Sequence, residues 1–353
     1  MLLAADAAAT LPDGPYVLRS AAGGWEAVSV EVTAAGARPR SRLVKEGESL
    51  MVAAVGQAPA FAVKLRAPAP DSGSSVDTKD APVFVVADTH GEYEIFVGML
   101  RDHQIVDARL RWKFGRGHLV VLGDVFDRGP NHLEILWLLY ELEAEAARAG
   151  GGVHLVLGNH EVMALSGDLR YLNTHYSETA QVLGKASYSE LFARDSMLGQ
   201  WLRSKPAMLV VNDSLCLHAG VSRALLDSGL TIADINATVR STLNGEPGQG
   251  AIGELVMGTN GPLWYRGYFA EQSAFLTATA EDVELTLKTF GARRILIGHT
   301  IVPTITPMYG GKVIAVQVYP KREPGGTAFE SLLIRKGKLL RAQPGGAELP
   351  LAR

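Results

Sequence analysis

The chain has 353 residues, of which 47% are hydrophobic and 20% charged, and its formal net charge is -3. This balance excludes a disordered chain, and the length predicts one large globular domain with a smaller one. A nearly neutral chain has no broad basic surface, so neither nucleic acid nor an anionic membrane is an expected partner. No apolar run approaches the ~18 residues of a membrane span. The single cysteine, Cys216, excludes an internal disulfide. The sequence does not specify an oligomeric state.

Residues 1–70 predict a small N-terminal β domain. The start, MLLAADAAATLPDGPY, lacks the basic segment of a signal peptide but has the small residues of a trimmed one. We therefore favour a periplasmic or secreted protein over a cytoplasmic one. Four alternating runs, YVLRS, WEAVSVEVT, SLMVAAVG and FAVKLRA, are typical of short strands. They carry no cluster of acids and histidines, which favours a packing or oligomerisation module over a ligand-binding one.

Residues 71–82, rich in Ser and Asp with Gly and Pro, predict a linker to a catalytic domain at 83–341. In that domain short apolar runs end abruptly in polar residues: PVFVVADTHG, HLVVLGDVFDRG, VHLVLGNHEVM, SLCLHAGVS and RRILIGHT. Helical patterns separate the first three, and this alternation predicts parallel crossovers in a layered α/β fold. Ligands of such sheets bind beyond the carboxyl ends of the strands, where all these polar clusters lie.

The segment 163–206 interrupts the alternation directly after the third run. Its mostly helical periodicity predicts a helical insertion that forms a lid or wall beside the site. Near the C-terminus, KVIAVQVYP and AFESLLIRKGKLLRA predict strands of a hairpin-rich second sheet. Residues 342–353 predict a mobile tail.

The run LVVLGDVFDRG places Asp124, Asp127 and Arg128 at the end of a buried strand. Unpaired charges out of water cost several kcal/mol, so a metal ion on Asp124 and a phosphate on Arg128 would compensate them. The clusters together offer carboxylate, imidazole and amide oxygen, the ligand types of a two-metal hydrolytic site. Such ligands admit manganese, iron, zinc or cobalt. The residues concerned are Asp88, His90, Asp124, Asn159, His160, His218 and His299.

The motifs DTHG, GDVFDRG, GNHE, HAG and GHT, between Asp88 and Thr300, resemble the signature of the phosphoprotein phosphatase family of calcineurin-like metallophosphoesterases. GNHEVMALSGDLRY, LRSKPAML and GPLWYRG are similar to its bacterial Shewanella-like phosphatase branch, which is associated with phosphotyrosine in phosphoproteins. The resemblance implies a two-sheet α/β sandwich flanked by helices, and a phosphatase with two divalent metal ions.

The resemblance also implies the metal ligands. Asp88 and His90 would bind the first ion, Asp124 would bridge both, and the second ion would have three further ligands: Asn159, His218 and His299. The chain departs from the family at Ala219, where many relatives have Gly, and at Gln317, where relatives often have Asp.

The remaining site residues take catalytic and substrate-binding roles by the same resemblance. His160 would be the general acid that protonates the leaving oxygen, and Asp127 would orient its imidazole. An imidazole beside a carboxylate titrates near neutral pH, which suits this role. Arg128 and Arg266 would hold the phosphoryl oxygens.

Three functions stay open at this point. The first is a phosphomonoesterase that acts on a phosphoprotein or small phosphomonoester, with phosphotyrosine preferred. The second is a phosphodiesterase or dinucleoside-polyphosphate hydrolase, because symmetrical nucleotide hydrolases share much of this motif set. The third is partner recognition through the N-terminal β domain. Glu161 could cap a helix or orient a ligand. Several aromatic residues could stack on a leaving group or pack in the core: Tyr171, Tyr176, Trp264, Tyr265 and Tyr268.

Overall fold

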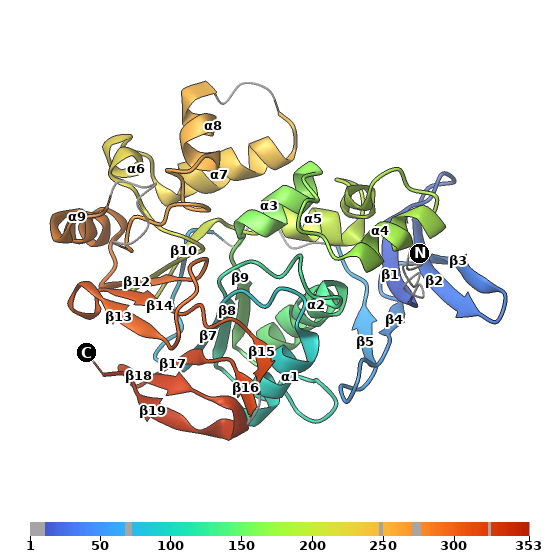
Figure 1. The fold of residues 1–353 in the computed structure, drawn as a ribbon, viewed down its shortest axis with the longest axis horizontal. Helices are drawn as coiled ribbons and strands as arrows, with labels where there is room; N and C mark the ends of the chain where they lie inside the picture. Colours follow the sequence, from blue (N-terminus) through green and yellow to red (C-terminus); the bar gives the residue numbers. More distant parts are fainter. Residues whose placement is uncertain (1–10, 68–72, 247–249, 270–276, 324–325, 353) are drawn as a thin grey trace, which may run out of the picture.

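The structure, a computed structural model, describes residues 11–67, 73–246, 250–269, 277–323 and 326–352. Figure 1 shows a mixed α/β fold in which two six-stranded sheets lie against each other with helices around them. This arrangement confirms the predicted fold class. The Ala-rich stretch at 1–10, which suggests export, lies outside the described residues. None of the described helices is long and apolar enough to cross a membrane.

The first sheet contains the first three apolar runs of the catalytic domain. Its parallel strands are β7 (Val83–Val86), β8 (His118–Val121) and β9 (Gly152–Leu155), joined by helices α1 (Tyr93–Asp102) and α2 (His132–Arg148). All residues of β7 and β8 are buried, as expected for parallel strands covered on both faces. Antiparallel strands continue the sheet: β17 (Ser331–Arg335), β18 (Lys338–Ala342) and β19 (Glu348–Pro350).

The second sheet has the order β13-β14-β12-β11-β10-β6. Its strands are β6 (Ser75–Val76), β10 (Met208–Val211), β11 (Ser214–Leu217), β12 (Arg294–Ile297), β13 (Thr306–Met308) and β14 (Val313–Ala315). Strands β11, β12 and β14 are parallel, so their carboxyl ends share one edge. The helices between β11 and β12 are α6 (Arg223–Asp227), α7 (Ile232–Leu243), α8 (Gly250–Met257) and α9 (Ala280–Phe290).

The segment 163–206 is helical, as predicted. After α3 (Asn159–Ser166) it contains α4 (Thr174–Val182), the short 3₁₀ helix η1 (Tyr188–Phe192) and α5 (Met197–Arg203). Ser and Asn residues cap these helices: the side chain of Asn173 accepts a hydrogen bond at the start of α4, and that of Ser196 does so for α5.

The N-terminal part is β-structured, as predicted. Strands β1 (Asp13–Arg19), β2 (Trp25–Thr33) and β3 (Gly36–Val44) form one antiparallel sheet, and β4 (Ser49–Val52) pairs with β5 (Phe61–Lys64). Most of its buried apolar residues belong to the same cluster as those of the two large sheets. The indole of Trp137 in α2 donates a hydrogen bond to the carbonyl of Pro15, at 2.8 Å. The domain boundaries at 70 and 82 stay a prediction.

Four local expectations differ from the structure. The linker at 71–82 contains β6, which pairs with β10. The tail at 342–353 is not free, because β19 pairs with β18 after the 3₁₀ helix η3 (Pro344–Gly346). The hairpin β17–β18 joins the first sheet beside β7 and not the second. The strand β3 has no counterpart in the predicted elements, because its sequence, GARPRSRLV, is mostly exposed and polar.

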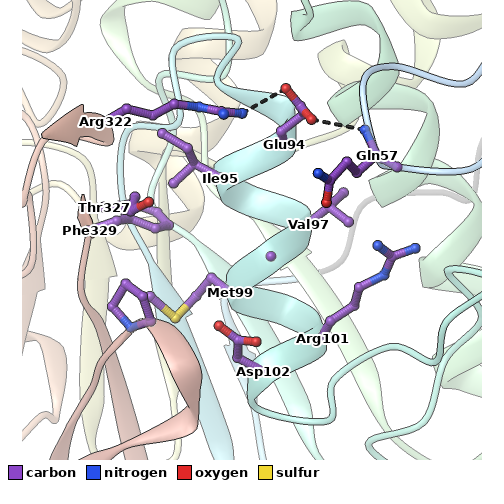
Figure 2. Close-up of a pocket in the computed structure, with 13 residues that line it drawn as sticks. Gln57, Glu94, Ile95, Val97, Met99, Arg101, Asp102, Arg322, Thr327 and Phe329 are labelled. Carbon is purple, nitrogen blue, oxygen red and sulfur yellow. Dashed lines mark hydrogen bonds and ion pairs between the residues drawn. The ribbon is translucent and has the colours of Figure 1, made fainter. Parts of the chain in front are cut away.

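A groove runs along α1, between the N-terminal part and the C-terminal hairpin of β15 (Lys321–Glu323) and β16 (Gly326–Ala328) (Figure 2). Glu94 on α1 connects its two sides: one oxygen accepts the backbone N–H of Gln57 at 3.0 Å, and the other pairs with Arg322 at 2.7 Å.

In the second sheet, the first turn after β13 is the 3₁₀ helix η2 (Tyr309–Gly311).

Candidate metal centre and active site

The structure brings all ten predicted site residues together beyond the carboxyl ends of β7, β8, β9, β11 and β12. A cavity of about 380 Å³ opens there, lined by Asp88, His90, Asp124, Arg128, Asn159, His160, Tyr171, Trp264, Arg266, His299, Thr300, Ile301 and Gln317. Two predicted residues, Asp127 and His218, lie beneath this lining and are fully buried. The edge of the sheet therefore concentrates carboxylates, imidazoles and guanidinium groups, as the position of the motifs predicts.

The chain turns sharply where the strands end. Asp88, His90, Asp124 and His299 all have positive φ, between 28° and 63°, in the left-handed region that non-glycine residues rarely adopt. The preceding Gly123 has a φ of 88°, and a Cβ there would lie 2.4 Å from the backbone nitrogen of Gly158. The motifs GD and GN therefore need glycine, because the turns after β8 and β9 pass in close contact.

One group of possible metal ligands surrounds the Nε2 atom of His218. This atom lies 2.9 Å from Oδ1 of Asn159, 3.1 Å from Nδ1 of His299 and 3.2 Å from Oδ2 of Asp124. A second group contains His90, Asp124 and His160, and the Nε2 atom of each of these histidines lies 3.8 Å from the same oxygen of Asp124. The Asp124 carboxylate thus belongs to both groups.

Hydrogen bonds to backbone carbonyl oxygens orient two of the histidine rings for binding a cation. Nδ1 of His218 lies 2.7 Å from the carbonyl oxygen of Leu122, and Nδ1 of His90 lies 2.9 Å from that of Phe126. When Nδ1–H donates to a carbonyl, Nε2 keeps its lone pair for a metal, which is the usual arrangement of histidine ligands. Nε2 of His299 is buried and has no hydrogen-bond partner among the described residues. This donor set fits divalent metal ions.

Charge is unevenly distributed over these groups. Burial raises the pKa of Asp88 to about 7, because desolvation disfavours its carboxylate. Burial also acts to raise the pKa of Asp124, but His218 and His160 outweigh it and hold that pKa well below its usual value. Conversely, burial acts to lower the pKa of His218, yet Asp124 and Asp88 raise it to about 9. Asp124 is therefore the carboxylate that keeps its negative charge, with the positive charge of the histidines around it.

Asp127 and His160 form a closely hydrogen-bonded pair. Oδ2 of Asp127 lies 2.5 Å from Nδ1 of His160, and neither side chain is more than 5% exposed. Burial acts to lower the pKa of His160, but Asp124 and Asp127 outweigh it and raise that pKa. The ring is held with Nδ1–H toward Asp127, so Nε2 is the atom that can exchange a proton with a ligand in the cavity.

The two arginines occupy different surroundings. The side chain of Arg128 is exposed at the cavity, with its guanidinium 5.6 Å from the ring centre of Tyr319. Arg266 is half-buried, and its Nη1 donates to the carbonyl of His299 at 2.9 Å and to the hydroxyl of Thr300 at 2.8 Å. Arg128 is thus free to meet an anion, whereas Arg266 is already fixed beside His299.

Glu161 has a larger role than its sequence indicates. Its buried carboxylate accepts four backbone N–H groups: those of Asp124, Val125, Phe126 and Gly158, at 2.7–3.3 Å. It caps α3 and also holds the loop that carries Asp124, so both readings left open by the sequence apply. Its place three residues after Gly158, the position of a capping-box acid, is the signal that indicates the cap.

The sequence assigned no role to three further residues at the site. Tyr319 and Ile301 lie outside the motifs, and Thr300 ends the GHT motif but has no predicted contact there. Of the five aromatic residues considered, only Tyr171 and Trp264 line the cavity. Tyr176, Tyr265 and Tyr268 are at most 4% exposed and pack in the core. The two positions at which the chain departs from the family lie in different surroundings. Gln317 lines the cavity, whereas Ala219, which follows His218 in the sequence, is buried.

The family model described as calcineurin-like phosphoesterase matches residues 81–303, which include every predicted site residue. The chain belongs to the calcineurin-like phosphoesterase family. This phosphoesterase is 28% identical over 265 residues to Shewanella-like protein phosphatase 2 of Arabidopsis thaliana, a match that covers 63% of this chain and 67% of that protein. The match therefore spans about two thirds of that relative's length.

A solved structure resembles the phosphoesterase over nearly its whole length. The cold-active protein-tyrosine phosphatase of a psychrophilic Shewanella species superposes with a TM-score of 0.83 at 30% identity, covering 97% of this chain and 100% of that one. A symmetrical bis(5'-nucleosyl)-tetraphosphatase of Chromobacterium violaceum is 27% identical over 139 residues, or 39% of this chain and 43% of that protein. The recognised family and the hydrolase class are confirmed.

Proposed function

We propose that this phosphoesterase is a dinuclear metal-dependent phosphomonoesterase that acts on phosphoproteins and prefers phosphotyrosine. The observation that carries the proposal is the Asp124 carboxylate, which belongs to two groups of buried donor atoms at the floor of one cavity. Arg128 and Arg266 line the same cavity. Metal ligands beside two guanidinium groups suit a terminal phosphate, which carries two negative charges.

Each ligand has a place in this proposal. Asp88 and His90 would hold one ion, with Asp124 shared, and the other ion would take Asn159, His218 and His299. Bound divalent ions supply positive charge and a water that is activated for attack on phosphorus. Manganese, iron, zinc and cobalt all accept such ligands. Hydrogen bonds from Nδ1 of His90 and His218 to carbonyl oxygens support the arrangement, because they keep Nε2 directed at the centre.

His160 would donate a proton to the leaving oxygen. Asp127 keeps its ring in one orientation and helps to keep it protonated, as the raised pKa indicates. Arg128 would bind the phosphoryl oxygens bidentately from the open side of the cavity, and Arg266 would contribute charge from its fixed position.

The preference for phosphotyrosine is supported by the mouth of the cavity. Tyr171 and Ile301 are 49% and 57% exposed there, and Trp264 lies on the same lining. Exposed apolar and aromatic groups favour an aromatic leaving group over an alkyl one. The similarity to a protein named as a protein-tyrosine phosphatase, at 30% identity over nearly the whole chain, points the same way.

The alternative is hydrolysis of a phosphodiester or a dinucleoside polyphosphate. The similarity to a symmetrical tetraphosphatase supports it, although that match covers only 39% of the chain. Both candidates use the same metal centre, so they differ only in what the cavity accepts around the phosphorus.

The test compares para-nitrophenyl phosphate with bis(para-nitrophenyl) phosphate, on protein stripped with a chelator and then supplied with manganese. We expect strong monoester turnover that disappears without metal. A preference for the diester would reject the monoesterase and support the alternative.

Phosphopeptides of one sequence, carrying phosphotyrosine or phosphothreonine, then test the preference. We expect Tyr171→Ala to reduce kcat/KM for the phosphotyrosine peptide more than for the phosphothreonine peptide. Equal losses on both peptides would reject the aromatic contact. Export to the periplasm or medium stays a proposal, and fractionation of cells that express the native gene tests it.

A further inference from the structure

The loop of residues 127–130, here called the Arg128 loop, has an unfavourable backbone. Asp127 and Arg128 have φ values of 71° and 64°, in the left-handed region. Non-glycine residues in this region cost about 1–2 kcal/mol each, and they persist where the surroundings fix them. The guanidinium of Arg128 forms no ion pair among the described residues and lies 5.6 Å from the ring centre of Tyr319, so the backbone of the loop sets where the side chain begins.

The helical insertion supplies three hydrogen bonds to this backbone. The N–H of Arg128 donates to the carbonyl of Tyr171 at 3.1 Å, and the side-chain amide of Asn173 donates to the carbonyl of Arg128 at 2.8 Å. The hydroxyl of Tyr176 donates to the carbonyl of Pro130 at 2.6 Å and accepts the N–H of His132 at 2.9 Å. The loop is therefore bound at both sides of Arg128 by residues of one segment.

A buried chain of side chains continues from here to the N-terminal strand. The ring of His132 stacks on that of Tyr176 with centres 3.8 Å apart, and its Nε2 lies 2.7 Å from the hydroxyl of Tyr188. That hydroxyl lies 3.0 Å from the hydroxyl of Tyr16, which donates to Asp13 at 2.7 Å. All four rings are at most 1% exposed.

The hydrogen bonds in this chain have one consistent direction. Because Tyr16 donates to Asp13, its oxygen accepts from Tyr188, and the oxygen of Tyr188 accepts from Nε2–H of His132. The other ring nitrogen of His132 has no partner among the described residues, as expected for a neutral ring with its proton on Nε2. Each member is thus held by the next, from β1 to the start of α2.

We propose that Tyr176, with the chain Asp13–Tyr16–Tyr188–His132 behind it, positions Arg128 for phosphate binding. This proposal rests on the phosphate contact of Arg128 in the proposed function. It gives the N-terminal strand β1 a part in substrate binding, through the insertion and not through contact with the substrate. Tyr176 and Tyr16 are positioning residues in this scheme.

The test uses Tyr176→Phe and Tyr16→Phe, with Tyr140→Phe as the matched control. The hydroxyl of Tyr140 is equally buried, donates to the carbonyl of Arg66 at 2.7 Å and accepts its N–H at 2.8 Å, so the control removes the same pair of bonds elsewhere. The readouts are the inhibition constant of inorganic phosphate and KM for para-nitrophenyl phosphate, with the melting temperature measured alongside.

We expect Tyr176→Phe to raise both constants about fivefold, the effect of one hydrogen bond, and Tyr16→Phe to raise them about twofold. Tyr140→Phe should lower the melting temperature to a similar extent and leave both constants unchanged. Combined with Arg128→Ala, Tyr176→Phe should have no further effect, because the residue it positions is absent.

Three results would overturn the proposal in distinguishable ways. If Tyr176→Phe behaves as Tyr140→Phe does, the positioning role is wrong while the proposed function stands. If its effect persists in the Arg128→Ala background, it acts on another group. If Arg128→Ala itself leaves the phosphate constant unchanged, the phosphate contact in the proposed function fails first. Should Tyr176→Phe not fold, Asn173→Ala at a half-buried position tests the same loop.

Discussion

Glu161 offers the sharpest test of how the site is built. Its Oε1 accepts the N–H groups of Val125 and Phe126, and its Oε2 accepts those of Asp124 and Gly158. In Glu161→Gln one oxygen becomes an amide that donates. Either orientation of that amide leaves two backbone N–H groups facing another donor.

The magnitude follows from these contacts. A hydrogen bond to a charged acceptor contributes about 1.5–3 kcal/mol, so two lost bonds cost about 3–6 kcal/mol. Removing a buried charge offsets part of this, because burial raises the pKa of Glu161 and so disfavours its carboxylate. We take about 3 kcal/mol as the net loss. With an unfolding entropy of about 0.7 kcal/mol/K for 353 residues, the melting temperature should fall by about 4 K.

The assay is calorimetric melting of metal-free protein, with kcat/KM measured after manganese is restored. The control is Glu190→Gln. One oxygen of Glu190 accepts the N–H groups of both Ala186 and Ser187 on the exposed surface, so an amide oxygen can replace it. We expect the control to change the melting temperature by less than about 1 K. A Glu161→Gln protein as stable and as active as that control would refute this account of the loop.

The other predictions concern single groups. His160→Ala should reduce kcat far more on phenyl phosphate than on para-nitrophenyl phosphate, because only the poorer leaving group needs the proton; equal losses on the two esters would argue against a general acid. Arg266→Ala should raise KM for monoesters about tenfold, since a charged contact of about 1.5 kcal/mol is lost; unchanged kcat and KM would remove Arg266 from the binding site. Burial acts to raise the pKa of Glu330, but hydrogen bonds from Arg341 and Gln343 outweigh it and lower the pKa to about 2. The folded pKa is below the unfolded value of 4.5, so this carboxylate stabilises the fold by about 3 kcal/mol above pH 4.5, and the stabilisation is lost as the pH falls toward 2. Urea unfolding of Glu330→Gln should therefore show a deficit at pH 5 that shrinks by pH 3, and a deficit of equal size at both pH values would contradict the assignment.

The site could be predicted because its residues follow a simple geometric rule. Asp88, Asp124 and Asn159 each come directly after a short apolar strand, and parallel strands end at one edge of a sheet. His218 and His299 follow strands of the second sheet, which meets the first at the same edge. Local sequence therefore fixes which residues meet, without knowledge of the strand order.

The pairing of strands that lie far apart in the sequence could not be predicted in the same way. The pattern of β17 and β18 identifies a hairpin, but nothing in it says that Leu333 pairs with Phe84 of β7, which places the hairpin in the first sheet and not in the second. The two residues of β6 are too few to show alternation, and the apolar content of β19 is too low. Similarly, the partner of Tyr16 is 172 positions away, so a buried polar chain of this kind leaves no trace in the local sequence.

The left-handed backbone at the proposed metal ligands and in the Arg128 loop has a consequence for protein engineering. Asp124, Arg128 and His299 occupy conformations that glycine adopts more easily. A library selected only for thermal resistance should therefore enrich glycine or asparagine at these positions, and the clones that it enriches there should be inactive. Screens for a heat-resistant variant of this enzyme need turnover as a second criterion. The surface of the N-terminal part, where Leu43 on β3 and Met51 on β4 are more than 60% exposed, is a safer region to mutate.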